Sequence, residues 1–233
     1  MRFRSKNSSY LSIALLGLVA IAVVALAAPR FLANLRYLPV EAALKRYYAT
    51  NEIPSERLPV LIRFAKQAIA RNDHYHFHDG LSLLHLLRAQ DVNTPALERR
   101  PAYILSMEEA ASSLARAPAQ TATWLRLANL RWLLHEEPET VIDAWKMSIF
   151  TGRTAVPYAN QRVDLGLAYL GFLDEEGIAM LRDQLLLAWR LRPGSLVHVL
   201  SSRDRNLELT RRLIENSDPI ALAEMEAWLE KLP

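Results

Sequence analysis

The chain has 233 residues, of which 51% are apolar and 7 are glycine. This length accommodates one medium helical domain together with a membrane segment. Long runs rich in alanine and leucine, without sustained alternation of apolar and polar residues, argue against strands. The absence of cysteine excludes disulfide bonds, thiolate catalysis and cysteine-ligated metal sites. We therefore expect an all-α protein.

The positive net charge is confined to the first residues of the chain. Arg2, Arg4 and Lys6 are the only charged residues before Arg30, so the other 25 of the 28 basic residues balance the 25 acidic ones. A nucleic-acid-binding surface requires clustered excess positive charge. The neutral body therefore argues against nucleic-acid binding.

Residues 10–28 form an uncharged, mainly apolar run of 19 residues. A helix of this length, at about 1.5 Å per residue, crosses a hydrocarbon core of about 30 Å. The basic residues in 1–9 predict a cytoplasmic N-terminus in the inner (cytoplasmic) membrane and a body in the periplasm or outside the cell. Two alternatives stay open. Ala25-Leu26-Ala27 has the small-x-small form of a signal-peptide cleavage site, and the run could be a buried helix of a soluble protein.

Turn residues divide the rest of the chain into helices. Residues 29–57 are expected to form a junction, in which an apolar stretch ends at the membrane–water interface near Tyr37 and a new helix starts at Val40. Further helices are expected at 58–70, 74–90, 102–117 (after a turn that Pro101 ends), 195–202 and 206–216. Asp218 and Pro219 have the residue types of an N-cap and a first helical position, so residues 218–233 are expected to form a helix that closes the end of the domain.

The clearest unit is a helical hairpin within residues 114–150. Trp124 and Ala128 lie on one apolar stripe, and the small alanine lets a second helix approach closely. Pro138 marks the start of that second helix, which carries Trp145 on the facing side. We expect Trp145 to be buried between two helices and this hairpin to be the centre of the domain's stability.

This hairpin resembles a tetratricopeptide (TPR) repeat, whose first helix carries an aromatic, a leucine-small pair and a large residue. The second helix, PETVIDAWKMSI, follows the small-aromatic-small pattern of the family, and Pro118 lies where the family places its helix-ending proline. The first-helix spacing recurs at Leu165, Gly166 and Tyr169. Pro193 then follows Pro118 by 75 residues, or two units of slightly more than standard length. TPR-like repeats are therefore expected over 58–217, most clearly over 105–195.

The resemblance implies an α-solenoid whose concave face binds an extended or helical segment of another protein. On this basis we expect a non-catalytic scaffold without a cofactor, serving a cell-envelope complex such as one for polysaccharide assembly or export. The expected groove-facing contacts are Arg126, Asn129, Arg131 and Arg162. As exposed groups, the arginines should contribute little to folding. Trp132 is expected either to be buried or to extend this polar patch.

A metal-dependent enzyme is one alternative. His74, His78 and His85 share one helical face at i, i+4 and i+11, where two of them could bind zinc or copper. The competing explanation is that His74–Phe77 cap and pack the start of a helix, with half-exposed imidazoles.

An accessory membrane subunit is the other alternative. Ala14, Gly17 and Ala20 are small residues within 10–28, and small residues let transmembrane helices pack closely. In that case the membrane helix itself, and not the helical body, would bind the partner.

Overall fold

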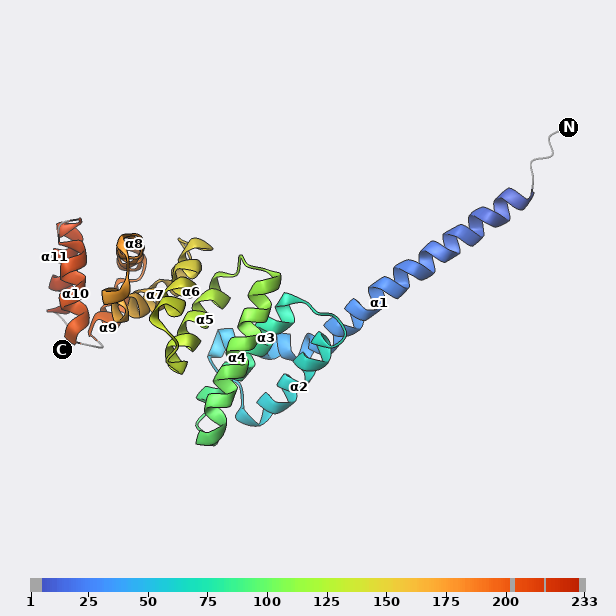
Figure 1. Ribbon diagram of the computed structural model, residues 1–233, viewed down its shortest axis with the longest axis horizontal. Helices are drawn as coiled ribbons and strands as arrows, with labels where there is room; N and C mark the ends of the chain where they lie inside the picture. The colour runs from blue at the N-terminus through green and yellow to red at the C-terminus, as the bar shows by residue number, and fades with distance from the viewer. Residues whose placement is uncertain (1–5, 202–203, 216, 231–233) are drawn as a thin grey trace.

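The computed structural model describes residues 6–201, 204–215 and 217–230. All regular secondary structure in these ranges is helical, which confirms the predicted all-α class (Figure 1). The helices are α1 (Lys6–Thr50), η1 (Ser55–Arg57), α2 (Leu58–Ile69), α3 (Tyr75–Gln90), α4 (Ala96–Arg116), α5 (Thr121–Leu134), α6 (Pro138–Phe150), α7 (Val156–Ala168), η2 (Leu170–Phe172), α8 (Glu175–Leu191), α9 (Pro193–Ser201), α10 (Asp204–Ile214) and α11 (Pro219–Leu229). Arg2 and Arg4, on which the predicted topology depends, lie outside the described residues.

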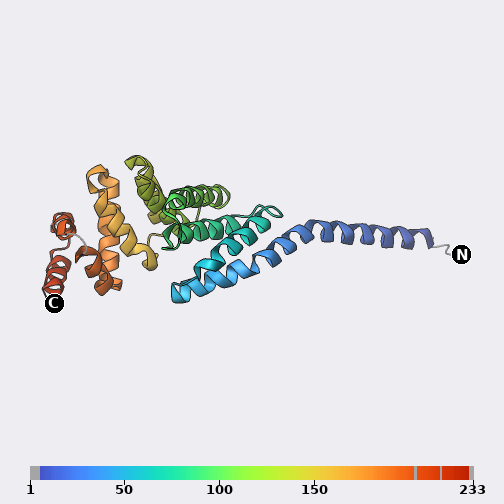
Figure 2. The ribbon, with the colours of Figure 1, turned by 90° about the horizontal axis from the view of Figure 1, so that it is seen from below.

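α1 runs without interruption from a protruding N-terminal half into the helical body. One face of its second half is buried against α2 and α3. The residues of this face are Ala33, Tyr37, Val40 and Leu44. The structure therefore corrects the expected junction, because residues 29–50 are helical and Tyr37 is buried. Pro29 and Pro39 lie inside α1, and the helix bends before it enters the body (Figure 2), since each proline removes a backbone hydrogen bond.

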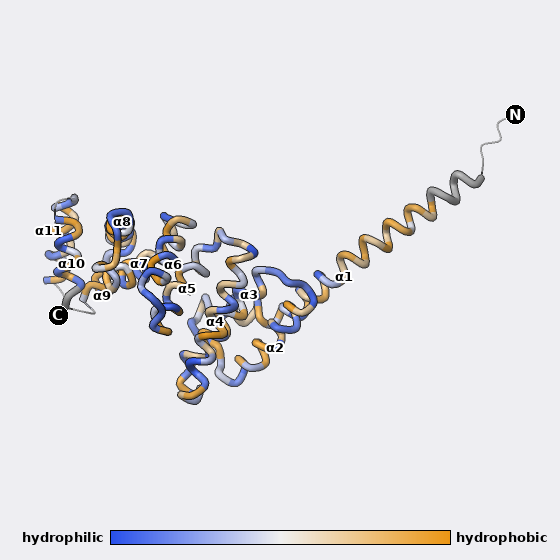
Figure 3. The backbone as a smooth tube through the Cα atoms, viewed as in Figure 1, coloured by the Kyte–Doolittle hydropathy of each residue, from blue (hydrophilic) through white to orange (hydrophobic). Residues whose placement is uncertain are grey.

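The protruding half of α1 is hydrophobic along most of its length (Figure 3). Its large apolar side chains from Ile13 to Leu26 are exposed. By length and composition, α1 is the one helix in the described part of the chain that could cross a membrane. The predicted span of 10–28 lies within this half.

The helices from α1 to α8 pack mainly against the helix before or after them in the chain (Figures 1 and 2). Alternate helices also touch, as α1 does with α3 and α5 does with α7. The hydrophobic core has two parts: one is shared by α1, α2 and α3, and the other extends from α4 to α11. The side formed by α1, α3, α5 and α7 contains the candidate site.

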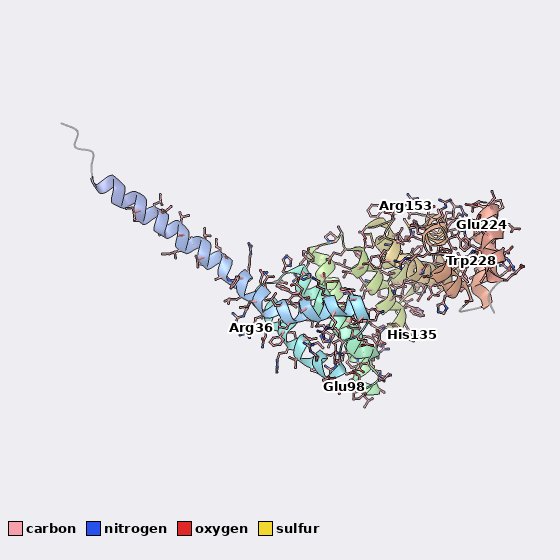
Figure 4. The ribbon with its side chains drawn as sticks, turned by 180° about the vertical axis from the view of Figure 1, so that it is seen from behind. Arg36, Glu98, His135, Arg153, Glu224 and Trp228 are labelled. Carbon is pink, nitrogen blue, oxygen red and sulfur yellow. The ribbon has the colours of Figure 1, made fainter. Side chains whose placement is uncertain are left out.

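The predicted helices after residue 57 are present in the described ranges, with shifted boundaries, and the predicted ends at 202, 216 and 233 lie outside those ranges. α4 begins at Ala96 and contains Pro101, where the sequence predicts a turn. Asp218 caps α11 as predicted, because its side chain accepts a hydrogen bond of 3.0 Å from the backbone N–H of Ala221. Trp228 of α11 contacts Trp189 edge to face, with ring centroids 6.2 Å apart, at the end of the molecule far from the protruding helix (Figure 4).

Candidate protein-binding groove

A groove of about 400 Å³ lies among the alternate helices α1, α3, α5 and α7. The last turn of α1 and the start of α7 contribute its two ends, and α3 and α5 contribute the residues between them. Its lining residues are Tyr47, Tyr48, Leu83, Leu86, Gln90, Ala122, Leu125, Arg126, Asn129, Leu130, Trp132, Leu133, Tyr158 and Gln161. Among these described residues, Arg126 is the one charged side chain, and the others are aromatic, aliphatic or amide groups.

α5 contributes half of the lining because it is apolar on two sides. Leu125, Asn129 and Leu133, at i, i+4 and i+8, lie on the side that faces the groove. Leu127 and Ala128 lie on the other side and are buried in the core that includes α6, as the hairpin pattern predicts. The same helix therefore holds its hairpin together and presents a surface to the groove.

Arg126 lies in the groove but is held by the protein itself. Its Nη1 donates hydrogen bonds of 2.9 Å to both the backbone carbonyl and the carboxylate of Asp79 on α3. The hydroxyl of Thr123 donates to the same carboxylate at 2.6 Å. Only 9% of Arg126 is exposed, so the expectation of a free, exposed guanidinium is wrong. Arg126 therefore joins α5 to α3 through Asp79, beneath the groove.

Asn129 and Arg131 differ in position although they are two residues apart. Asn129 lines the groove and donates one amide hydrogen bond of 2.9 Å to the carbonyl of Leu125. Arg131 is not among the groove residues, because its Nη1 donates to the carbonyl of Thr140 at 2.6 Å and thereby links α5 to the start of α6. Trp132 is half-buried and lines the groove, so the patch of Arg126, Asn129 and Trp132 is present at this surface.

Arg162 is fully buried, and its predicted place in the groove is wrong. Its guanidinium donates to the carbonyl and hydroxyl of Ser148, to the carbonyl of Gly152 at 3.0 Å and to the amide oxygen of Gln184 at 2.9 Å. Ser148 and Gly152 lie at the C-terminal end of α6, where carbonyls lack intrahelical partners and the helix dipole favours a cation. Burial lowers the pKa of Arg162 to about 10. Arg162 therefore fastens α6 to α7 and α8.

Trp145 confirms the expected burial at the centre of the domain. It is 1% exposed, and its indole N–H donates to the carbonyl of Arg162 at 2.8 Å. Gly166 of α7 lies against it, since a Cβ at this position would be 2.9 Å from Cζ2 of Trp145 and 2.7 Å from Cδ1 of Leu181. The small residue predicted from the TPR-like spacing is thus required by close packing.

The three candidate metal ligands have separate environments. His74 caps α3, with Nδ1 accepting from the backbone N–H of His76 at 3.3 Å. His78 bridges two carboxylates, with Nε2 at 2.7 Å from Asp73 and Nδ1 at 2.6 Å from Glu109. His85 is 2% exposed, and neither of its ring nitrogens has a hydrogen-bond partner among the described residues. The expectation that His74–Phe77 cap and pack a helix start fits the cap formed by His74 and the burial of Phe77, while the rings of His74 and His76 are exposed.

The geometry of these histidines does not favour the metal-dependent alternative. In the described part of the chain, no three or more histidine, aspartate or glutamate side chains converge as a metal site. The Glu109 hydrogen bond raises the pKa of His78, with a second contribution from Asp73. Burial lowers the pKa of His85 to about 4. One ring thus favours the charged form and the other the neutral form.

The groove also contains residues that the sequence analysis missed. Tyr47 and Tyr48 reach it only because α1 continues through Pro39, and Tyr158 reaches it from the first turn of α7. The available signal was the concentration of aromatic residues at the ends of alternate helices. Because the sequence predicts a junction before Val40, it does not indicate that Tyr47 and Tyr48 lie beside aromatic residues of other helices.

Comparison with family models and curated sequences adds no relative to this picture. Neither a protein-family model nor a curated protein sequence matches the chain. The TPR resemblance therefore rests on the residues quoted in the sequence analysis, and the groove has to be interpreted from its own chemistry.

Proposed function

We propose that this protein is a membrane-anchored, non-catalytic adaptor with a TPR-like α-solenoid body that binds a segment of another protein of the cell envelope. The packing of successive helices and the contact of Trp145 with Gly166 support the repeat interpretation. The hydrophobic, protruding half of α1 supports the membrane anchor. Polysaccharide assembly or export is one setting that the resemblance suggests.

The observation that carries the proposal is the aromatic lining of the groove. Tyr47, Tyr48, Trp132 and Tyr158 come from three different helices and meet in one groove. Aromatic side chains are enriched in protein interfaces because they bury a large area at low entropic cost while their polar atoms stay hydrogen-bonded. A groove built from alternate helices, with amides between the rings, suits a polypeptide segment with a few apolar anchors.

The charged groups that contact α3 support a binding role over catalysis. Arg126 is paired with Asp79, and His78 is paired with Asp73 and Glu109 on the α3–α4 side. A catalytic site would bring such groups together within reach of a bound substrate. Here they link helices to one another, so the proposal assigns this chain no reaction and no cofactor.

Photo-crosslinking in cells tests the groove directly. A photoreactive phenylalanine analogue at the exposed groove residue Gln161 should crosslink to one partner, giving an adduct of defined mass. The same analogue at Asp143, which is exposed on α6 and is not a groove residue, is the matched control. Trp132→Ala together with Tyr158→Ala should abolish the adduct, because both rings are part of the groove.

Two results would contradict this proposal. Equal adducts from Gln161 and Asp143 would mean that the groove is not the binding surface. An adduct from Gly17 alone, with none from Gln161, would favour the accessory subunit that binds through its membrane helix, because Gly17 lies on the exposed part of α1.

The predicted topology has its own test. The native chain contains no cysteine, so a single cysteine at the exposed Glu139 reports where the body lies. A membrane-impermeant thiol reagent added to spheroplasts should label it. Labelling that appears only after the membrane is opened would place the body in the cytoplasm and overturn the proposed orientation.

A further inference from the structure

An apolar stripe continues along α1 beyond the predicted membrane span. Phe31, Leu35 and Leu38, at i, i+4 and i+7, are 66%, 52% and 53% exposed. They lie on the side of α1 opposite to Ala33, Tyr37 and Val40, which are buried in the body. A terminal helix of a repeat array normally presents polar residues on its outer face. We therefore expect this apolar outer face to be covered by lipid or by another molecule.

A second group of exposed residues lies beside the same part of α1. The turn between α2 and α3 and the first residues of α3 carry Arg71, His74, Tyr75 and His76, all of which are exposed. Tyr37 positions this turn, because its hydroxyl donates to the carbonyl of His76 at 3.3 Å and its ring lies 5.1 Å from the His76 ring. The apolar stripe thus lies on one side of α1, and this turn packs against another side of the same helix.

The position of both groups along α1 places them next to the membrane. At about 1.5 Å per residue, Phe31 lies roughly 5 Å and Leu38 roughly 15 Å beyond Ala28, the end of the predicted span. The headgroup layer extends about 5–8 Å beyond the hydrocarbon core on each side. Phe31 therefore lies within this layer, whereas Leu35 and Leu38, roughly 10 Å and 15 Å beyond Ala28, reach it when α1 tilts toward the stripe, as transmembrane helices do by about 20° and by up to about 40°.

We propose that Phe31, Leu35 and Leu38 of α1, together with Arg71, His74, Tyr75 and His76, form a collar that binds the headgroup region of an anionic bilayer. This proposal rests on the membrane anchor proposed above. Its consequence is a body fixed on the membrane surface. Thr50, at the far end of α1, is then roughly 30 Å from the bilayer, and the groove beside it faces a partner at that height.

Composition and continuity select the bilayer as the occupant of the collar. Aromatic and basic residues are typical of membrane–water interfaces, where rings settle at the headgroups and cations meet phosphates. Arg30 and Arg36 flank the stripe, and Figure 4 shows Arg36 where α1 enters the body. Asp73, the carboxylate in the turn, is already paired with Arg116 and His78. The stripe belongs to the same helix as the hydrophobic half, so lipid around that half also reaches the stripe.

Depth-dependent fluorescence quenching tests the collar in the full chain. Single cysteines at Val24, Leu38, Tyr75 and Asn51 would be labelled with an environment-sensitive fluorophore, and each protein would be placed in phosphatidylglycerol-containing nanodiscs. Nitroxide lipids labelled in the headgroup should quench the Leu38 and Tyr75 probes about three-fold more than the Asn51 probe at the distal end of α1. Nitroxides deep in the acyl chains should quench the Val24 probe most.

The outcomes separate the collar from the anchor on which it depends. A quenched Val24 probe with Leu38 and Tyr75 probes as unquenched as Asn51 would overturn the collar and leave the anchor standing. An unquenched Val24 probe would overturn both. A disulfide between two Leu38→Cys chains, without quenching at that position, would make a second copy of the chain the occupant and would also overturn the collar.

Charge removal tests the choice of an anionic surface. Arg36→Gln with Arg71→Gln should reduce headgroup quenching of the Tyr75 probe about two-fold in phosphatidylglycerol, and have little effect in phosphatidylcholine. Arg57→Gln is the matched control, because Arg57 is exposed at the distal end of the first helix pair. Equal effects of the collar and control substitutions would contradict the electrostatic part of the proposal.

Discussion

Two regions of the body each bury a basic side chain, and they surround it with different partners. Between α3 and α4, His78 has a carboxylate at each ring nitrogen, Asp73 at Nε2 and Glu109 at Nδ1, and these contacts raise its pKa and favour the charged imidazole. Between α6, α7 and α8, Arg162 donates to backbone carbonyls, a hydroxyl and an amide oxygen. The first interface depends on a histidine whose pKa is raised by its carboxylate partners, whereas the pKa of Arg162 in the second is about 10. The comparison predicts one pH-sensitive interface and one pH-insensitive interface within a single fold.

Removal of the Arg162 side chain should have the largest effect. Arg162→Ala leaves a cavity and several buried oxygens without donors, so it should lower the free energy of unfolding by about 3–5 kcal/mol. Urea unfolding of the detergent-solubilised full chain, followed by tryptophan fluorescence, measures this loss. The loss should be the same at pH 5.5 and pH 8.5. Arg153→Ala, which removes an exposed partner of Asp183, is the control and should change stability by less than about 0.5 kcal/mol.

An unchanged unfolding midpoint in Arg162→Ala would restore the original expectation that this side chain serves the groove. That expectation fails in the structure for a physical reason. Sequence periodicity assigns an arginine to a polar face, because charged residues are rarely buried without partners. The partners of Arg162 are carbonyls at the end of α6, and no local pattern reveals them.

Filling the position of Gly166 should have the next largest effect. Gly166→Ala would place a Cβ less than 3 Å from Trp145 and Leu181, and such overpacking costs about 1–3 kcal/mol. The same unfolding experiment measures this cost. Gly171→Ala is the matched control, because nothing lies within 4 Å of a Cβ at that position. Equal stability of both variants would mean that α7 and α8 have room to move apart.

The sequence predicts the individual helices of this fold better than it predicts where one helix continues into the next segment. Trp145, Gly166 and the Asp218 cap follow from spacing, because helical periodicity and capping are local properties. The continuity of α1 does not follow, because Pro29 and Pro39 favour a break in any local reading. Burial of the α1 face against α2 and α3 holds the helix together through Pro39, whereas Pro29 lies before this buried face. The two groove tyrosines of α1 were missed for this reason, since their position depends on that continuity.

Replacement of His78 should have a smaller effect that depends on pH. The folded pKa of His78 is raised, so its stabilisation is fully present below the unfolded pKa of about 6.5 and is lost as pH rises through the folded value. His78→Gln should therefore cost about 1–2 kcal/mol at pH 5.5 and less at pH 8.5. Denaturant midpoints of both proteins at the two pH values measure this difference. A cost that stays constant with pH would mean that His78 is neutral in the folded protein.

Replacement of His85 should have the smallest effect at neutral pH, and it should have the opposite sign. His85 is on the same helix as His78, but it is buried without a hydrogen-bond partner in the described chain, and its pKa is lowered to about 4. A lowered folded pKa means that stability is complete above the unfolded pKa of about 6.5 and is lost as pH falls toward the folded value. His85→Leu removes two unsatisfied nitrogens, so it should stabilise the protein by about 1 kcal/mol at pH 7. This gain should increase between pH 6.5 and pH 5, where the native histidine increasingly favours the unfolded state. A gain that shrinks on acidification would show that His85 has an acidic partner in solution, and the α3–α4 interface would then contain two charged histidines.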